Sequence, residues 1–174
     1  NVNKVVRACE RARLWDPAVY LYTHDKQHDS AIKTMMERGN AFDNDIFLDA
    51  ITKVRNNEIM YKAVGYYLAM HPNLFTRLME VTEESIDHSR VVSQLRRSGD
   101  GALKLGQEYL KSVQKNNLSP VNEALNELYV EDEDYEALRK SIDGFNNFNM
   151  IALASKLATH ELLEFRRISA YVYR

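Results

Sequence analysis

The sequence predicts an all-α protein of the α-solenoid type, in which short helices pair as antiparallel hairpins. Apolar residues recur at helical spacing in about a dozen segments of about ten residues each. No segment alternates apolar and polar residues as a strand would, and the three prolines all lie at expected helix edges. A four-helix bundle would need fewer and longer helices, so the many short segments favour a stacked solenoid.

The stretch from residue 14 to residue 36 is the clearest hairpin in the sequence. Asp16 is expected to cap a first helix, with Pro17 in its first turn. The polar tract 23–28 then predicts a turn, and Asp29 is expected to cap a second helix. Two helices this short bury too little apolar area to be stable alone, so the hairpin needs neighbours.

Polar residues ahead of the other apolar runs predict where the remaining helices begin. The expected caps are Asp43, Asp87, Ser119 followed by Pro120, Asn149 and Thr159. The acidic run Glu131–Asp134 is expected at a helix start, where the helix dipole favours negative charge. In the opening helix, we expect one buried face with Val5, Cys9 and Ala12, and a buried Trp15 at the turn that follows.

Composition limits the classes of function. The 174 residues include 23 basic and 25 acidic side chains, for a net charge of −2, so no basic field favours nucleic acid. Cys9 is the only cysteine, which excludes an internal disulfide and favours a reducing compartment. No apolar run approaches the roughly 18 residues of a membrane span. We expect a cytoplasmic chain without direct membrane insertion, residues 1–174 forming a single continuous segment cut from a longer protein.

Three motifs resemble chemical sites only in part. The helix beginning at His160 opens like a zinc-protease motif, but Glu164 stands where the second histidine is needed. Gly101 and Gly106 have phosphate-loop spacing, yet Gln107 follows where lysine is required. Cys9 fits the apolar spacing of its helix and is expected to be a small core residue. We therefore expect no catalytic residue, no metal and no cofactor, and hence no enzyme.

Several uncommon strings, in order along essentially the whole chain, resemble the clathrin heavy-chain family. They are ACERARLW at 8–15, YKAV at 61–64 with YL at 67–68, DHSR at 87–90, VNEALN at 121–126, EDYEALR at 133–139 and HELLEFRR at 160–167. The residues 23–28 and 96–106 depart from the family pattern, and both are expected turns.

The resemblance implies a zigzag made of parts of one or two clathrin heavy-chain repeats, in the proximal leg near the trimerisation hub. It implies a structural part of the clathrin coat, on the cytoplasmic face of coated pits and coated vesicles, supporting lattice assembly and vesicle-mediated transport. The implied partners are clathrin light chain and other heavy-chain legs of the trimer and lattice. The alternative is a clathrin-repeat segment of a vacuolar-sorting or tethering complex subunit.

Basic side chains near turns and helix ends are the natural counterparts of the acidic, helical light chain that the resemblance implies. We therefore select four lysines as light-chain-binding candidates: Lys26, Lys104, Lys111 and Lys115. Coat assembly in the family is favoured by mild acid, so the histidines matter as well. His88 is expected to be partly buried, and the other four, His24, His28, His71 and His160, exposed. The alternative is that they are ordinary surface histidines without a role in assembly.

Overall fold

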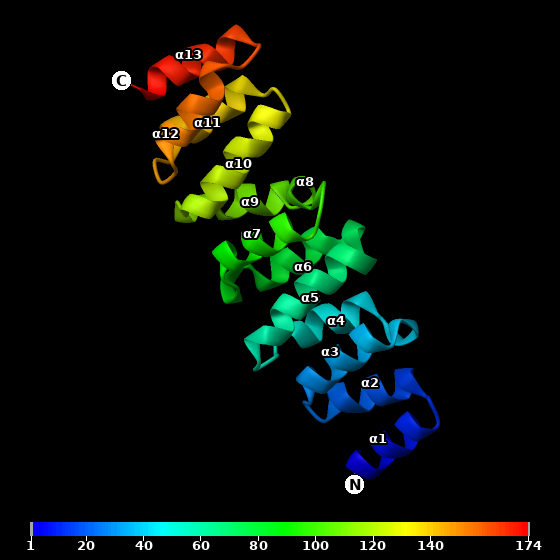
Figure 1. The fold of residues 1–174 in the computed structure, drawn as a ribbon. Coiled ribbons are helices and arrows are strands. Elements are labelled where there is room, and N and C mark those ends of the chain that lie inside the picture. Colours follow the sequence, from blue (N-terminus) through cyan, green and yellow to red (C-terminus); the bar gives the residue numbers. More distant parts are fainter. Residues whose placement is uncertain (1, 174) are drawn as a thin grey trace. The chain divides into compact units, whose positions relative to one another are not determined.

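The computed structural model describes residues 2–173, which form thirteen α-helices and four 3-10 helices and contain no strand. Consecutive helices fold back on one another as short hairpins, which confirms the predicted all-α solenoid (Figure 1). Contacts divide the chain after Ile86 into two compact units, here called unit 1 and unit 2. That residues 1–174 form one continuous solenoid segment stays a prediction.

In unit 1, α1 packs against α2, α2 against α3, α3 against α4 and α5 against α6, while α3 also contacts α5 and α4 contacts α6. Its elements are α1 (Val2–Arg11), α2 (Trp15–His24), α3 (His28–Glu37), η1 (Gly39–Ala41), α4 (Asn44–Ile51), α5 (Asn57–Met70), η2 (Pro72–Leu74), α6 (Phe75–Thr82) and η3 (Glu83–Ser85). Ala18 on α2 and Ala31 on α3 are fully buried. Such small side chains let two helix backbones approach closely, as the hairpin at residues 14–36 requires.

An aromatic cluster forms the part of the unit 1 core between α4 and α5. Phe47 and Tyr67 are fully buried, with ring centroids 5.2 Å apart. Phe42 packs on both of them and stacks on the His71 imidazole at 4.0 Å. The Tyr67 hydroxyl donates a hydrogen bond of 2.8 Å to the Asn44 side-chain oxygen, so its polar end is satisfied at the start of α4.

Unit 2 is organised around α10, which packs against α7, α8, α9 and α11. Its elements are α7 (His88–Arg97), α8 (Ala102–Leu105), α9 (Gln107–Val113), η4 (Gln114–Asn116), α10 (Ser119–Glu131), α11 (Tyr135–Gly144), α12 (Met150–Ala158) and α13 (Leu163–Val172). The last two helices form a tight hairpin, and α11 also contacts α13. Gly106 lies between α8 and α9, where an added Cβ atom would fall 2.8 Å from the Cδ1 atom of Leu95, so a larger residue would force the Leu95 side chain to shift.

Several expected N-caps are confirmed. The Asp43 carboxylate accepts hydrogen bonds from the backbone N–H groups of Asp45 and Ile46, both at 3.0 Å. Asp87 accepts in the same way at the start of α7, and Asn149 does so at the start of α12. Each of these side chains satisfies a backbone donor that the first turn of a helix leaves unpaired.

Other expected helix starts are wrong by a few residues. Helix α2 begins at Trp15, α3 begins at His28 and α10 begins at Ser119, so Asp16, Asp29 and Ser119 are not N-caps. Asp29 instead accepts a hydrogen bond from the backbone N–H of Arg55. Thr159 follows the end of α12, and α13 begins later, at Leu163. These four helices begin without a side-chain cap hydrogen bond, so the polar residues near their starts do not set where they begin.

The acidic run at residues 131–134 also differs from the expectation. Glu131 is the last residue of α10, and only Asp134 caps α11, by accepting a hydrogen bond from the N–H of Ala137 at 2.9 Å. Glu133 has a φ of 56°, in the left-handed region, and forms part of the turn between the helices. The run therefore spans a tight helix–helix turn, and its charges do not all lie at a helix start.

The opening helix buries a different face from the one expected. Val6 is buried, whereas Val5 and Ala12 are exposed and Cys9 is partly buried. Trp15 is only partly buried, with the Arg38 guanidinium lying over its ring at 4.6 Å from the ring centroid. Among the described residues α1 packs against α2, and Val6 is the one residue of α1 that this contact buries.

Candidate interaction surfaces

The four candidate lysines are all exposed, but they belong to two different units. Lys26 lies in the turn between α2 and α3 of unit 1, with a left-handed φ of 58°. The other three follow one another in unit 2: Lys104 on α8, Lys111 on α9 and Lys115 in η4. The last three therefore share one stretch of the unit 2 surface, whereas Lys26 has no candidate neighbour within unit 1.

Two of these lysines already have acidic partners. Lys104 forms an ion pair with Asp132 of the turn between α10 and α11. Lys111 donates to Glu108 on its own helix at 2.8 Å, and this hydrogen bond raises the pKa of the lysine above its ordinary value. A partner would therefore have to share both ammonium groups with the chain's own carboxylates.

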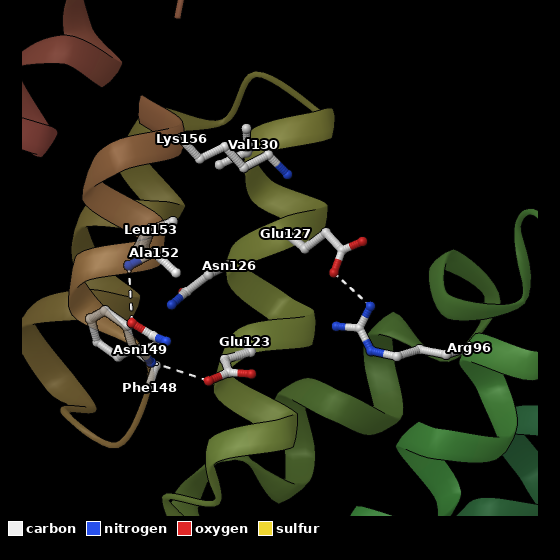
Figure 2. A pocket seen from close by; sticks show the side chains of 10 residues that line it. All are labelled: Arg96, Glu123, Asn126, Glu127, Val130, Phe148, Asn149, Ala152, Leu153 and Lys156. Atoms are coloured by element: carbon white, nitrogen blue, oxygen red, sulfur yellow. Dashed lines mark hydrogen bonds and ion pairs between the residues drawn. The ribbon is translucent and has the colours of Figure 1, made fainter. Parts of the chain in front are cut away.

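A groove in unit 2 combines apolar and charged lining residues. It lies between α10 and α12 and reaches the end of α7, with a volume of about 280 Å³ (Figure 2). Its lining residues are Arg96, Glu123, Asn126, Glu127, Val130, Phe148, Asn149, Ala152, Leu153 and Lys156. Apolar side chains therefore form much of the floor, and charged side chains stand at the edges.

Most charged groups of this groove are already paired with one another or with the backbone. Arg96 Nη1 lies 2.7 Å from Glu127 Oε2, which links α7 to α10 (Figure 2). Glu123 Oε1 accepts hydrogen bonds from the N–H of Asn149 at 3.1 Å and from the hydroxyl of Ser119 at 3.0 Å. The carboxylates on α10 thus help to position the neighbouring α7 and the loop before α12.

Beneath the groove runs a chain of buried polar side chains. Gln114 Nε2 donates to the Ser141 hydroxyl at 2.9 Å, and that hydroxyl donates to Asn126 Oδ1 at 2.7 Å. All three side chains are buried, and they come from η4, α11 and α10. The network fixes the Asn126 amide, because its oxygen is committed to Ser141 and its nitrogen must then face the other way, toward α12 (Figure 2).

A second asparagine cluster pins the loop between α11 and α12 to the start of α10. Asn122 is fully buried, and its Nδ2 donates to Asn117 Oδ1 at 2.8 Å and to the carbonyl of Asn147 at 2.9 Å. Asn117, with a left-handed φ of 49°, also bonds to Asn146 and to Asn147 through its side chain and backbone. These bonds hold one end of the groove in a defined position.

At the far end of unit 2, a guanidinium group joins α11 to α13. Arg139 Nε donates to Asp143 Oδ2 at 2.9 Å, and the guanidinium lies 3.4 Å from the centroid of the Tyr171 ring. The Tyr171 hydroxyl donates to the other Asp143 oxygen at 3.0 Å. The hydrogen bond from Arg139 lowers the pKa of Asp143, and the one from Tyr171 lowers it further.

The histidines differ from the expectation, because only His24 is exposed. His28 and His160 are partly buried, and His160 Nδ1 accepts a hydrogen bond from the N–H of Leu162 at 3.1 Å. His71 stacks on Phe42 in the aromatic cluster, and His88, partly buried as expected, lies 2.7 Å from the Tyr109 hydroxyl. Three histidines expected at the surface therefore contribute to packing.

The structure also bears on metals and membranes. Among residues 2–173, no group of three or more histidine, cysteine, aspartate or glutamate side chains is placed to hold a metal ion. In the same part of the chain, no helix has the length and apolar character that crossing a membrane requires.

Sequence reasoning missed the groove and the asparagine that faces it. Asn122 and Asn126 stand four residues apart in a helix whose other inward positions are apolar, and both are buried. Polar residues at buried positions usually have a specific hydrogen-bonding role. Two asparagines on the apolar face of this helix are therefore the feature of the sequence that indicates a buried polar network.

Stacked short helices with shallow grooves and charged edges define a helical-repeat protein, the class that works through its surfaces. A family model described as "Region in Clathrin and VPS" matches residues 1–75 and 79–174. The chain belongs to this clathrin family.

Relatives from distant organisms share this similarity along the whole chain. The chain is 48% identical over 175 residues to clathrin heavy chain 1 of Oryza sativa subsp. japonica and 48% identical over 175 residues to the clathrin heavy chain of Dictyostelium discoideum. It is 47% identical over 175 residues to the clathrin heavy chain of Drosophila melanogaster. Each match covers 100% of this chain and 10% of the relative, so the chain spans about a tenth of the length of these proteins.

Proposed function

We propose that this chain is a leg segment of a clathrin-type heavy chain, with a structural and not a catalytic role. It supports lattice assembly at the cytoplasmic face of coated pits and coated vesicles, and so serves vesicle-mediated transport. The observation that carries the proposal is the identity of 47–48% to clathrin heavy chains over the full 174 residues. The repeat fold supports it, because stacked hairpins form a spacer with long exposed sides.

A vacuolar-sorting or tethering subunit is the alternative that the family description leaves open, since it includes VPS proteins. The similar proteins named above are all clathrin heavy chains, and they come from a plant, an amoeba and an insect. This agreement favours the coat over the sorting complex.

A chimeric heavy chain tests the proposal. The matching segment of the Dictyostelium discoideum protein is replaced by this chain, and assembly of purified coats and fluid uptake by cells lacking their own heavy chain are measured. The matched control carries the segment of the Oryza sativa protein, which is equally similar to this chain. We expect both chimeras to assemble. A chimera with this chain that folds and trimerises but fails to assemble, while the control succeeds, contradicts the proposal.

We further propose that the partners include a clathrin light chain and neighbouring heavy-chain legs. For the light chain, the four candidate lysines remain our contact residues: Lys26, Lys104, Lys111 and Lys115. Exposed charges of this kind act mainly on association rate and salt dependence. Changing all four to Glu should weaken light-chain binding at low salt and flatten its dependence on salt concentration.

The control for this experiment reverses two exposed lysines outside the set, Lys33→Glu and Lys140→Glu. Breaking the exposed pairs of Lys104 and Lys111 should cost only about 0–1 kcal/mol each in folding free energy, so the variant should stay folded. Binding that is unchanged by the four reversals, or equally weakened by the control, removes these lysines from the light-chain site.

For contacts between legs, we propose that histidines at the turn of the first hairpin, His24 and His28, contribute to assembly in mild acid. A protonated histidine adds positive charge that acidic helix ends attract. Assembly of full-length heavy chain against pH, with both histidines changed to Gln, should shift its midpoint to lower pH. An unshifted midpoint assigns the pH response to other groups.

A further inference from the structure

We propose that the groove between α10 and α12 of unit 2 binds an extended peptide segment of a partner protein, in which an acidic side chain lies close to an apolar one. The proposal is independent of the coat role, since it rests on the chemistry of the groove alone. Three features of the groove support it: an apolar floor, an unpaired and nearly buried hydrogen-bond donor, and one unpaired positive charge.

The floor suits an aliphatic or aromatic side chain. Val130 of α10 and Ala152 and Leu153 of α12 line its two sides, and Phe148 lies at one end, beside Asn149 (Figure 2). The volume of about 280 Å³ lies at the lower end of the range for binding pockets, so it suits a few side chains and not a large cofactor. Apolar side chains entering this space would displace water from apolar walls, which is the main driving force for such binding.

Asn126 supplies the directional contact. The residue is only 2% exposed, and its Oδ1 is occupied by the Ser141 hydroxyl. The amide nitrogen points across the groove toward α12 (Figure 2), and among residues 2–173 no acceptor is paired with it. Among the described residues, the fully buried side-chain atoms without a partner lie elsewhere, at His28 and Asn122, so the Asn126 nitrogen is open to the groove. A carbonyl oxygen of a bound peptide can accept a hydrogen bond from it there. Because Ser141 fixes the amide orientation, the donor is already aimed before the ligand arrives.

Lys156 supplies the charge. The carboxylates of Glu123 and Glu127 are committed to Asn149 and Arg96, whereas Lys156 at the edge of α12 has no acidic partner among the described residues. Glu123 is bonded only to neutral donors, so its charge remains at one end of the groove, whereas Lys156 is the cation of the groove that has no carboxylate partner among the described residues. A carboxylate on the ligand is therefore favoured at the Lys156 end. A peptide carrying an Asp or Glu beside an apolar residue meets all three features at once.

Selection from a random peptide library displayed on phage tests the proposal on the full chain. The wild-type chain is the bait, and the variant Asn126→Asp, Lys156→Glu is used for counter-selection. Asn126→Asp retains an oxygen for Ser141 and replaces the donor by a second acceptor, so the buried network keeps its hydrogen bond. We expect enriched peptides to share an acidic residue close to an apolar one.

Selected peptides are then measured against single variants by fluorescence anisotropy. Asn126→Asp and Lys156→Glu should each weaken binding by about tenfold or more, since each removes one favourable contact and adds a repulsive one. Lys140→Glu, an exposed charge reversal on α11 away from the groove, should leave affinity unchanged. Ala152→Trp fills the groove from an exposed helix position without touching the buried network, and it should abolish binding even if Asn126→Asp folds poorly.

Three outcomes would overturn the proposal. The first is no enrichment over the double variant, and the second is enrichment of basic or uncharged peptides. The third is a wild-type chain that dimerises in light-scattering measurements and becomes monomeric in Ala152→Trp, because the occupant would then be a second copy of this chain. Binding that survives Ala152→Trp likewise places the peptide elsewhere.

Discussion

The buried cores of the two units differ in how many polar side chains they contain. In unit 1, the described core is apolar and aromatic, and its one buried polar side chain, Thr82, donates to the Leu78 carbonyl of its own helix. In unit 2, five polar side chains are buried: Gln114, Asn122, Asn126, Ser141 and Ser169. Four of them hydrogen-bond to one another or to loops and helices far along the chain, and Ser169 donates to the Ala154 carbonyl on α12.

This difference distinguishes two effects of a buried core, which are to stabilise the fold and to fix its geometry. Apolar burial stabilises without direction, because the hydrophobic effect depends on area and not on angle. Buried hydrogen bonds contribute less net stability but penalise every arrangement that breaks them, so they fix geometry. The core of unit 1 is therefore stabilised mainly by apolar burial. The core of unit 2 also contains directional hydrogen bonds, which fix the shape of the groove beside α10.

The largest expected effect comes from the aromatic cluster of unit 1. Phe47→Ala removes a fully buried ring that packs 5.2 Å from Tyr67 and 5.7 Å from Phe42. We expect a loss of about 3–5 kcal/mol in the free energy of unfolding, measured by hydrogen exchange of α4 and α5. The adjacent Ile46→Ala, at a side chain that is 37% exposed, should cost less than about 1 kcal/mol. Equal losses in the two variants would contradict a core centred on Phe47.

A smaller effect is expected from the polar network of unit 2. Ser141→Ala leaves Gln114 Nε2 and Asn126 Oδ1 without their partner, and we expect a total loss of about 1–3 kcal/mol in the free energy of unfolding. Denaturant unfolding together with hydrogen exchange of α10 and α11 measures the loss. Ser93→Ala is the control, because its exposed hydroxyl bonds only to the Ser89 carbonyl of its own helix. A loss no larger than that of the control would show that the network does not constrain unit 2.

The smallest effects are pH-dependent and differ in sign between the units. In unit 2, hydrogen bonds from Arg139 and then from Tyr171 lower the pKa of Asp143 in the folded chain. Ionised Asp143 therefore stabilises the fold fully above its ordinary pKa of about 4, and this stabilisation is lost as the pH falls through the lower pKa of the folded state. Asp143→Asn should therefore speed hydrogen exchange in α11 and α13 at neutral pH, and the difference from wild type should disappear in acid.

In unit 1, burial and a 2.8 Å hydrogen bond to Glu10 raise the pKa of Tyr22 to about 12. Protonated Tyr22 therefore stabilises the fold fully below its ordinary pKa of about 10, and this stabilisation is lost as the pH rises through the higher pKa of the folded state. Tyr22→Phe should weaken the α1–α2 contact at neutral pH with no change in its acid response. An acid-dependent effect of Tyr22→Phe, or an alkaline one of Asp143→Asn, would contradict these assignments.

The sequence was sufficient to predict the all-α hairpin architecture, because the 3.6-residue apolar period follows directly from which helix face is buried. It also predicted caps such as Asp43 and Asp87, where a side chain acts on its own backbone within three residues. The predicted starts of α2 and α13 were wrong, because these helices begin after Leu14 and Leu162 without a side-chain cap hydrogen bond, and a nearby polar residue therefore does not mark the start.

The groove could not be predicted, for a related reason. The Asn126 donor faces the groove only because Ser141, fifteen residues later, occupies its oxygen. Likewise, the Arg139 contact with Tyr171 joins residues on two helices that are separated by a third. Contacts of this length depend on the arrangement of whole helices, and a single sequence contains no periodic signal for them.

The most direct test of the account is whether the buried network of unit 2 controls the groove above it. Ser141 does not line the groove, so Ser141→Ala changes the surface only through Asn126. Affinity for peptides selected on the wild-type chain is measured by fluorescence anisotropy, at a temperature where hydrogen exchange shows the variant to be folded. We expect Ser141→Ala to weaken binding several-fold, because the Asn126 amide is no longer held in one orientation. Wild-type affinity in a folded Ser141→Ala chain would contradict the claim that the polar core sets the geometry of this surface.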